Sequence, residues 1–92
     1  MEENLDKCLE EINQLPNVIG VMYADRQGLC LGAKGHASNE SAGIITAIAD
    51  QAAKLEPNSK PPVVLLESET KQCFIQKADS VTAAIYKTIV TS

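Results

Sequence analysis

The spacing of apolar side chains predicts that residues 39–55 form an amphipathic helix around which the chain is organised. At about 100° per residue, a stripe of large side chains and a stripe of small ones fall on different sides of this helix. The large stripe contains Ile44, Ile48 and Leu55, and the small stripe contains Ala42, Thr46, Ala49 and Ala53. Together the two stripes cover about half of the circumference, although one sheet needs a stripe only a little over 100° wide. We therefore expect the large stripe to pack on the chain's own sheet and the small stripe to face a partner, unless this small domain wraps its helix unaided.

Shorter patterns predict a second helix and five strands. Apolar residues at helical spacing (Leu5, Cys8, Leu9 and Ile12) predict a helix over residues 4–15, which Pro16 ends. Apolar and β-branched runs separated by turn residues predict strands at residues 18–25, 29–34, 63–67, 72–77 and 81–87. The order α-β-β-α-β-β-β, with hairpin-linked strands, predicts an α+β fold with a mainly antiparallel sheet. We expect one domain spanning residues 1–92.

The continuous apolar run at residues 63–66 supports two placements of this strand. The lack of alternation is typical of a strand covered on both faces, but the preceding Pro61 and Pro62 also suit an edge. At an edge, its free N–H and C=O groups would accept another strand. The predicted partner interface is then Ala42, Ile45, Thr46, Ala49, Ala53, Val63, Val64, Leu65 and Leu66. On this hypothesis, Ala49→Trp breaks pairing and leaves the isolated chain folded.

The bulk composition excludes several classes of partner. A formal net charge of −4 and 3% aromatic residues argue against nucleic acid as a ligand. No run approaches the roughly 20 apolar residues that a membrane helix needs. The three cysteines form no CxxC pair, so neither a zinc site nor a disulfide framework is indicated. We expect a cytosolic chain that does not insert into a membrane itself. A partner would recruit it to any membrane surface.

No group of residues indicates catalysis. His36 is the only histidine, and Ser38 is better explained as a residue at the start of the central helix. The glycine-rich residues 28–35 do not match the phosphate-loop pattern G-x-x-x-x-G-K-[ST], and Asp79 suits a turn. We predict no catalytic residue, no cofactor and no metal. An enzyme or small-ligand domain, with only Cys30, His36 and Ser38 available, is the weakest alternative.

Five sequence segments together carry a family resemblance. They are D-R-Q-G-L-C-L-G (25–32), S-A-G-I-I (41–45), A-D-Q-A-A-K-L (49–55), P-V-V-L-L-E-S (62–68) and F-I-Q-K (74–77). With the element order, they resemble the roadblock family, which is related to dynein light chains. Within it they resemble most closely the Ragulator roadblock subunits of the hepatitis B X-interacting type. The resemblance covers nearly the whole chain in register. No single segment is diagnostic, and the support comes from all five segments occurring in order.

This resemblance implies a specific fold and a scaffolding function. The fold would be a five-stranded antiparallel sheet of order 2-1-5-4-3 between two helices, without a third, C-terminal helix. The chain would heterodimerise with another roadblock subunit through the central helix and the third strand, at the interface predicted above. A long lipidated subunit would wrap the dimers and hold them on the surface of the lysosome or late endosome. There the complex would dock Rag GTPases and support amino-acid activation of the mTOR kinase complex.

Two further expectations follow from the resemblance. Since the chain stops soon after Tyr86, part of the sheet face beside the first helix should be bare, and we expect the wrapping subunit to cover it. The alternative function within the family is that of a homodimeric roadblock regulator of a small GTPase.

Overall fold

The computed structural model describes residues 2–78 and 80–89, with side chains from residue 7 onward. Its elements run in the predicted order: α1 (Glu2–Asn13), β1 (Val18–Ala24), β2 (Cys30–Gly35), the 3-10 turn η1 (Asn39–Ser41), α2 (Ala42–Ala53), β3 (Val64–Glu67), β4 (Lys71–Ala78) and β5 (Val81–Thr88). The predicted central helix therefore begins as a 3-10 turn and ends two residues early. Asp79, predicted to lie in the last turn, is outside the described residues.

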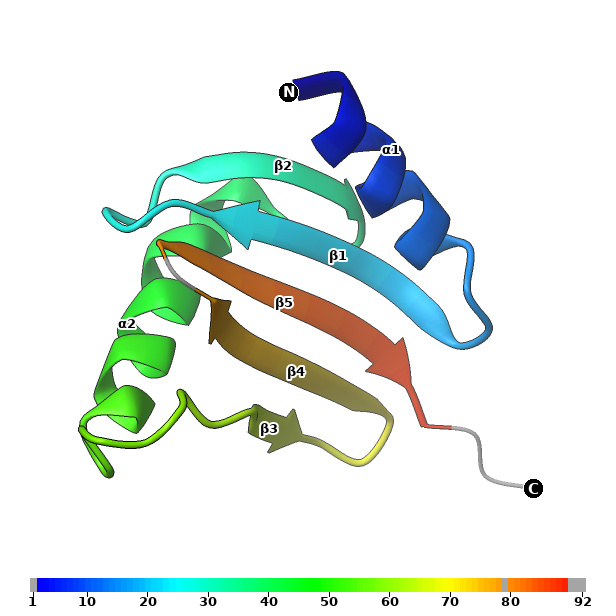
Figure 1. Cartoon of the computed structure of the whole chain (residues 1–92). Coiled ribbons are helices and arrows are strands. Elements are labelled where there is room, and N and C mark those ends of the chain that lie inside the picture. The colour runs from blue at the N-terminus through cyan, green and yellow to red at the C-terminus, as the bar shows by residue number, and fades with distance from the viewer. Residues whose placement is uncertain (1, 79, 90–92) are drawn as a thin grey trace.

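The five strands form one antiparallel sheet in the order β2-β1-β5-β4-β3 (Figure 1). The last strand, β5, lies in the middle of the sheet, where it pairs with β1 on one side and β4 on the other. The two edges are β2 and β3. This arrangement confirms the predicted strand order and confirms the edge placement of the third strand.

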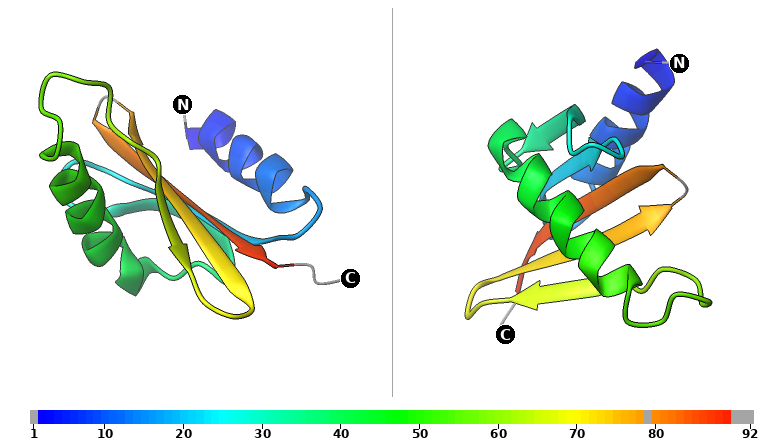
Figure 2. Two further views of the ribbon diagram at one scale, coloured as in Figure 1. Left: turned by 90° about the horizontal axis from the view of Figure 1, so that it is seen from below. Right: turned by 90° about the vertical axis from the view of Figure 1, so that its left-hand side faces the viewer.

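The two helices lie on opposite faces of the sheet (Figure 2). Helix α1 packs over β1 and β2, and α2 crosses β1, β5 and β4 on the other face. Leu9 of α1 is fully buried above Gly32, where an added Cβ would lie 2.6 Å from the Leu9 Cδ1 atom. Cys8, predicted to share the apolar stripe with Leu9, is exposed. The side chain of Leu5 is outside the described set.

The core lies between α2 and the sheet, and it reverses the predicted orientation of the helix. Its members are Met22, Ala24, Ala42, Ile45, Ala49, Ile75 and Ala84. The small stripe of α2 therefore faces the chain's own sheet, whereas Ile44 is 67% exposed and Leu55 is 80% exposed. The physical reason is steric: Met22 and Ile75 already occupy much of the space above the sheet, so small side chains such as Ala42 and Ala49 let α2 approach closely, and Ile45 is the large side chain of α2 that becomes buried.

The prediction that residues 63–66 are covered on both faces is also wrong. Val63, Leu65 and Leu66 are all exposed, and only Val64 packs partly against the core. A continuous apolar run therefore does not show that the chain itself covers both faces of a strand.

Candidate partner interface

One flank of α2 presents apolar side chains that the chain covers only in part: Ile44 and Leu55 are exposed, and Ile48 is half-buried against the core. The opposite flank is bound to the sheet through Asp50. Its Oδ1 accepts a hydrogen bond from Lys77 Nζ of β4 at 2.8 Å. At about 100° per residue, Ile44, Ile48 and Leu55 lie more than 90° around the helix from Asp50. Ile48 of the helix, Cys73 of β4 and Tyr86 of β5 all pack against the edge of the same core cluster. The apolar flank therefore borders the half of the sheet face that α2 does not cover.

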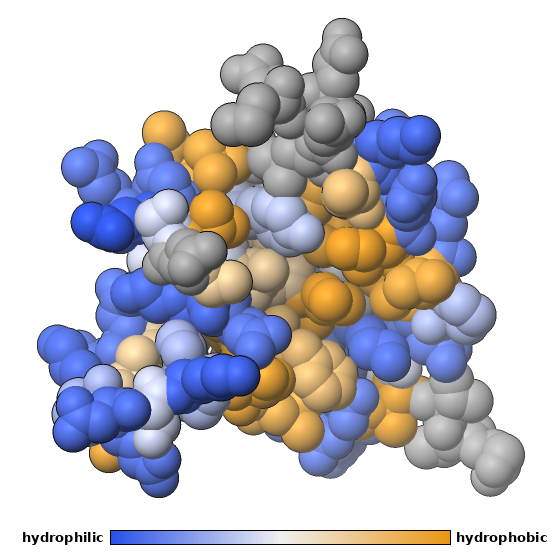
Figure 3. All heavy atoms as spheres, viewed as in Figure 1, coloured by the Kyte–Doolittle hydropathy of each residue, from blue (hydrophilic) through white to orange (hydrophobic). Residues whose placement is uncertain are grey.

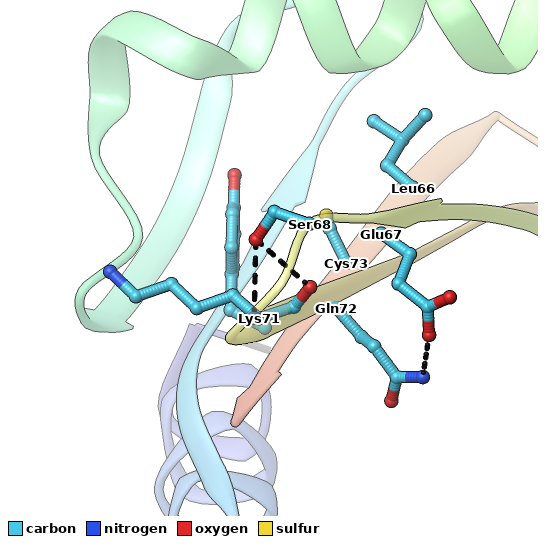
Figure 4. A pocket seen from close by; sticks show the side chains of 7 residues that line it. Leu66, Glu67, Ser68, Lys71, Gln72 and Cys73 are labelled. Atoms are coloured by element: carbon cyan, nitrogen blue, oxygen red, sulfur yellow. Dashed lines mark hydrogen bonds between the residues drawn. The ribbon is translucent and has the colours of Figure 1, made fainter. Parts of the chain in front are cut away.

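A hollow of about 320 Å³ occupies this uncovered half (Figure 4). It is lined by Leu66, Glu67, Ser68, Lys71, Gln72, Cys73 and Tyr86. Leu66 pairs with Cys73 across β3 and β4, and Cys73 pairs with Tyr86 across β4 and β5. These three side chains therefore project from the same face as one another. In Figure 4, Leu66 points toward the α2 layer, whereas Glu67 and Gln72 point away from it and share a hydrogen bond of 2.6 Å.

The floor of the hollow is uncharged at neutral pH. Burial raises the pKa of the Cys73 thiol above its ordinary value, and a hydrogen bond with Tyr86 offsets part of this rise. Burial, and then the neighbouring Cys73, raise the pKa of Tyr86 above 10.0. A thiol that stays protonated is a poor nucleophile. The hollow therefore suits an apolar side chain better than covalent chemistry.

The outer edge of β3 adjoins the hollow and carries free backbone groups. The Ser68 N–H donates to the Lys71 carbonyl at 2.9 Å, which makes these residues a hydrogen-bonded pair. Since bonded pairs alternate in an antiparallel ladder, Leu66 and Val64 bond inward to β4, while the peptide groups of Leu65 and Glu67 point outward. The described residues place no strand on this side of β3.

The predicted interface residues fall into two groups in the structure. Val63, Leu65 and Leu66 are exposed, and Val64 and Ala53 are half-buried. The other four offer a partner almost no surface, because their exposed fractions are 6% or less: Ala42, Ile45, Thr46 and Ala49. The candidate interface is therefore revised to the α2–β3 surface. We define it as the side chains of Ile44, Ile48, Leu55, Val63, Leu66, Cys73 and Tyr86 with the outer backbone edge at Leu65. Leu65 pairs with Phe74, so its side chain lies on the opposite face of the sheet, beside Phe74.

The size of the side chains could have identified three of the surface residues that the sequence analysis missed. Ile44, Ile48 and Leu55 were assigned to the chain's own sheet because they form the bulkier stripe. The sheet face already holds Met22 and Ile75, so it buries Ile45 and leaves room for only part of Ile48, whereas Ile44 and Leu55 stay exposed. Cys73 and Tyr86 had no distinguishing signal, because nothing in the sequence shows which part of the sheet α2 leaves open.

A second apolar region lies on the opposite face of the sheet, beside α1. This α1-side groove of about 310 Å³ is lined by Ile12, Leu15, Val18, Phe74, Ile85 and Lys87. Five strands about 4.8 Å apart span roughly 19 Å, and a helix is about 10 Å wide. Helix α1 therefore covers only the β1–β2 half, and apolar side chains remain visible beside it over β5 and β4 (Figure 3). The groove carries one charge, on Lys87, whose Nζ lies 5.8 Å from the centre of the Phe74 ring.

The residues considered for catalysis are not brought into one site. Cys30 packs against the core, whereas His36 and Ser38 are exposed. Among the described residues, no three His, Cys, Asp or Glu side chains are grouped in a way that could hold a metal ion. Within the same part of the chain, no helix has the length and apolar character needed to cross a membrane.

Comparison with known sequences places residues 1–87 in one family. They match the family model described as Ragulator complex protein LAMTOR5. The Ragulator complex protein LAMTOR5 of Xenopus tropicalis is 41% identical over 88 residues, which is 95% of this chain and 97% of that protein. The homologue from Nematostella vectensis is 39% identical over the same shares, and that from Dictyostelium discoideum is 29% identical over 87 residues, 95% of this chain and 98% of its own.

Comparison with solved structures supports the fold. Myxococcus xanthus MglB superimposes with a TM-score of 0.84 at 14% identity, covering 99% of this chain and 74% of that one. A roadblock/LC7 domain from Streptomyces avermitilis gives 0.76 at 13% identity, covering 90% and 77%. Sequence identities this low support only the assignment of the fold, which is that of the roadblock domains. With this fold, and with nearly its whole length matched in sequence, the chain belongs to the Ragulator complex protein LAMTOR5 family.

Proposed function

We propose that the chain is a non-catalytic scaffold subunit of a lysosomal Ragulator complex and acts by heterodimerising with another roadblock subunit. The assembled complex docks Rag GTPases and supports amino-acid activation of the mTOR kinase complex. The observation that carries this proposal is the α2–β3 surface, where an apolar helix flank, a hollow with an uncharged floor and a free strand edge adjoin one another. Family membership supports the assignment to Ragulator.

The way the partner binds follows from the unbonded peptide groups, the empty hollow and the exposed apolar side chains of the α2–β3 surface. A partner strand antiparallel to β3 bonds to the outward peptide groups of Leu65 and Glu67 and extends the sheet. If the partner has the same fold, a two-fold axis through the sheet places its central helix on the same face as α2. That helix fills the hollow and covers Ile44, Ile48 and Leu55. A standard interface of this kind buries roughly 800 Å² per partner.

The α1-side groove supports the second proposed contact, with the long lipidated subunit that wraps the dimers. Apolar surface of this extent on a small domain usually marks an interaction site. The wrapping subunit covers the bare β5–β4 half of this face and supplies the address to the lysosome or late endosome surface. Hydrogen exchange of residues 72–76 and 83–87 should therefore slow when the wrapping subunit joins the heterodimer. Equal exchange in both states would contradict this contact.

A pair of aspartate variants tests the heterodimer. Tagged chains carrying Ile44→Asp or Leu66→Asp are purified from cells with their bound chains, which are identified and quantified by mass spectrometry. An unpaired carboxylate buried at the interface costs a few kcal/mol. A cost of about 3 kcal/mol lowers the affinity for the roadblock partner about 100-fold, so each variant should co-purify with far less of that partner. The control is Leu15→Asp, which places the same charge at an exposed leucine on the opposite face. If all three variants retain the roadblock partner equally, the α2–β3 surface is not the interface.

The alternative, a homodimeric regulator of a small GTPase, uses the same edge with a second copy. Antiparallel pairing about a two-fold axis at Leu65 sets Val64 opposite Leu66 and Val63 opposite Glu67, so no like charges meet. Sedimentation of the isolated chain measures its mass, and nucleotide-turnover assays measure its effect on a GTPase. A homodimer that changes GTPase turnover on its own would favour the alternative over the scaffold subunit.

A further inference from the structure

The sheet edge farthest from the α2–β3 surface also exposes apolar side chains. Leu29 is 65% exposed and Leu31 is 46% exposed, and both lie on β2 or the turn before it. Arg26, the only arginine of the chain, is exposed in the same turn. Together with Ala33 and Gly35 farther along β2, these residues form what we call the hairpin edge.

The turn that carries Arg26 and Leu29 is held in one conformation by its own hydrogen bonds. Asp25 Oδ1 accepts from the N–H groups of Gln27 and Leu29, each at 2.9 Å. The Asp25 N–H donates to the Leu29 carbonyl at 2.8 Å, and the Gly28 N–H donates to the Asp25 carbonyl at 3.0 Å. Gly28 adopts a positive φ of 88°, which glycine tolerates without strain. A ligand that binds this turn therefore pays little to order it.

The outer side of β2 presents free backbone groups beyond the hairpin. The His36 N–H donates to the Ile19 carbonyl at 2.8 Å. This bond makes His36 and Ile19 a hydrogen-bonded pair, so the next pair, Gly35 opposite Gly20, is a non-bonded one. Ala33, two residues from Gly35, has the same orientation. The peptide groups of both residues therefore point away from β1. The register shift near Ala24 disturbs the ladder opposite Leu31. From Gly32 the pairing continues residue by residue to Gly35, where a positive φ of 66° departs from extended geometry.

The charge of this edge differs from that of the chain as a whole. Residues 26–36 contain no acidic side chain, although the net charge of the chain is −4, and the carboxylate of Asp25, just before them, accepts hydrogen bonds from the N–H groups of the turn. Lys34 pairs with Glu10 of α1 at 3.6 Å, whereas Arg26 forms no ion pair with any residue that the structure describes. A guanidinium group binds a carboxylate through two parallel hydrogen bonds, which makes an acidic side chain its natural complement.

We propose that the hairpin edge binds an extended segment of a partner protein in which an acidic residue lies close to apolar ones. The segment adds to β2 as a sixth strand and bonds to the peptide groups of Ala33 and Gly35. Its apolar side chains cover Leu29 and Leu31, and its carboxylate meets Arg26. From position 29 to position 35 a strand spans about 20 Å, so six or seven partner residues suffice. This site goes beyond the proposed pairing, because it occupies the opposite edge of the sheet.

A photo-crosslink in the assembled complex tests the chemistry of the partner segment. The full chain carries Leu29→p-benzoylphenylalanine, is irradiated in the complex purified from cells, and the crosslinked peptide is sequenced. We expect one segment with Asp or Glu within about three residues of apolar side chains, and slowed amide exchange at Ala33 and Gly35. Loss of a charge-assisted contact corresponds to roughly a tenfold or larger fall in affinity. Arg26→Glu should therefore lower the crosslink yield at least that much.

The control is Lys60→Glu, which reverses a charge on an exposed loop residue away from this edge and should leave the yield unchanged. The proposal is overturned by the absence of a crosslink, by a crosslink to a segment without acidic residues, or by equal yields from Arg26→Glu and Lys60→Glu. The roadblock partner is quantified in the same sample. If that partner is retained and no crosslink forms, the hairpin-edge proposal fails and the proposed function stands.

Discussion

Two alanines of α2, two positions apart, test which side of this helix faces the chain's own sheet. Ala49 is 4% exposed and belongs to the core cluster with Met22, Ile75 and Ala84. Ala47 is exposed on the other side of the helix. Tryptophan at position 49 has to displace α2 or its neighbours, whereas tryptophan at position 47 extends into solvent. The structure thus predicts opposite outcomes for the same substitution.

The magnitude follows from the cost of overfilling a packed core. An added large side chain typically costs about 1–3 kcal/mol. For a domain of this size, each kcal/mol lowers Tm by about 4–8 °C. Ala49→Trp should therefore lower the Tm of the isolated chain by about 4–24 °C, and Ala47→Trp should change the unfolding free energy by no more than about 0.5 kcal/mol. Far-UV circular dichroism during heating, with urea titration as a second measure, checks both values.

The refuting result is equally specific. If Ala49→Trp melts with the wild-type chain and loses only its partner, the small stripe faces outward, as the helical periodicity alone predicts. The burial of Ala42 and Ile45 would then be wrong as well, and the α2–β3 surface would have to be redrawn around the small stripe.

Three further outcomes check other parts of the structure by thermal or chemical denaturation. Gly43→Ala should stabilise the chain by about 0.5–1 kcal/mol, because a Cβ at this exposed helical position meets no atom within 4 Å; a loss of stability would contradict the packing of the first turn of α2. Gly20→Ala should destabilise it by about 1–3 kcal/mol, because its Cβ would lie 2.7 Å from the Ala37 backbone nitrogen, and wild-type stability would place that loop elsewhere. Since folding raises the pKa values of Cys73 and Tyr86, the folded state binds more protons above about pH 9, and the free energy of unfolding should fall as pH rises from there. Cys73→Ala should reduce this alkaline loss, and an unchanged pH profile would refute the burial of the thiol.

The local pattern of the chain was enough to predict its elements and their order. Alternation, turn residues and helical spacing act over a few residues, so they are visible in the sequence without knowledge of distant contacts. The five strands and two helices predicted this way are all present, and the strand order implied by the resemblance is confirmed. The edge placement of residues 63–66 was open from the sequence, because a run of apolar residues looks the same in an inner strand and in an edge strand that awaits a neighbour.

Which stripe of α2 meets the sheet was decided only by the tertiary structure. Periodicity measures the angle between Ala49 and Ile44 around the helix, and it carries no information on the shape of the surface opposite them. That shape depends on Met22 and Ile75, which come from strands far away in sequence and leave room above the sheet for Ala42, Ala49 and one isoleucine, Ile45. The position of the candidate interface therefore follows from steric fit between distant segments, which no local pattern contains.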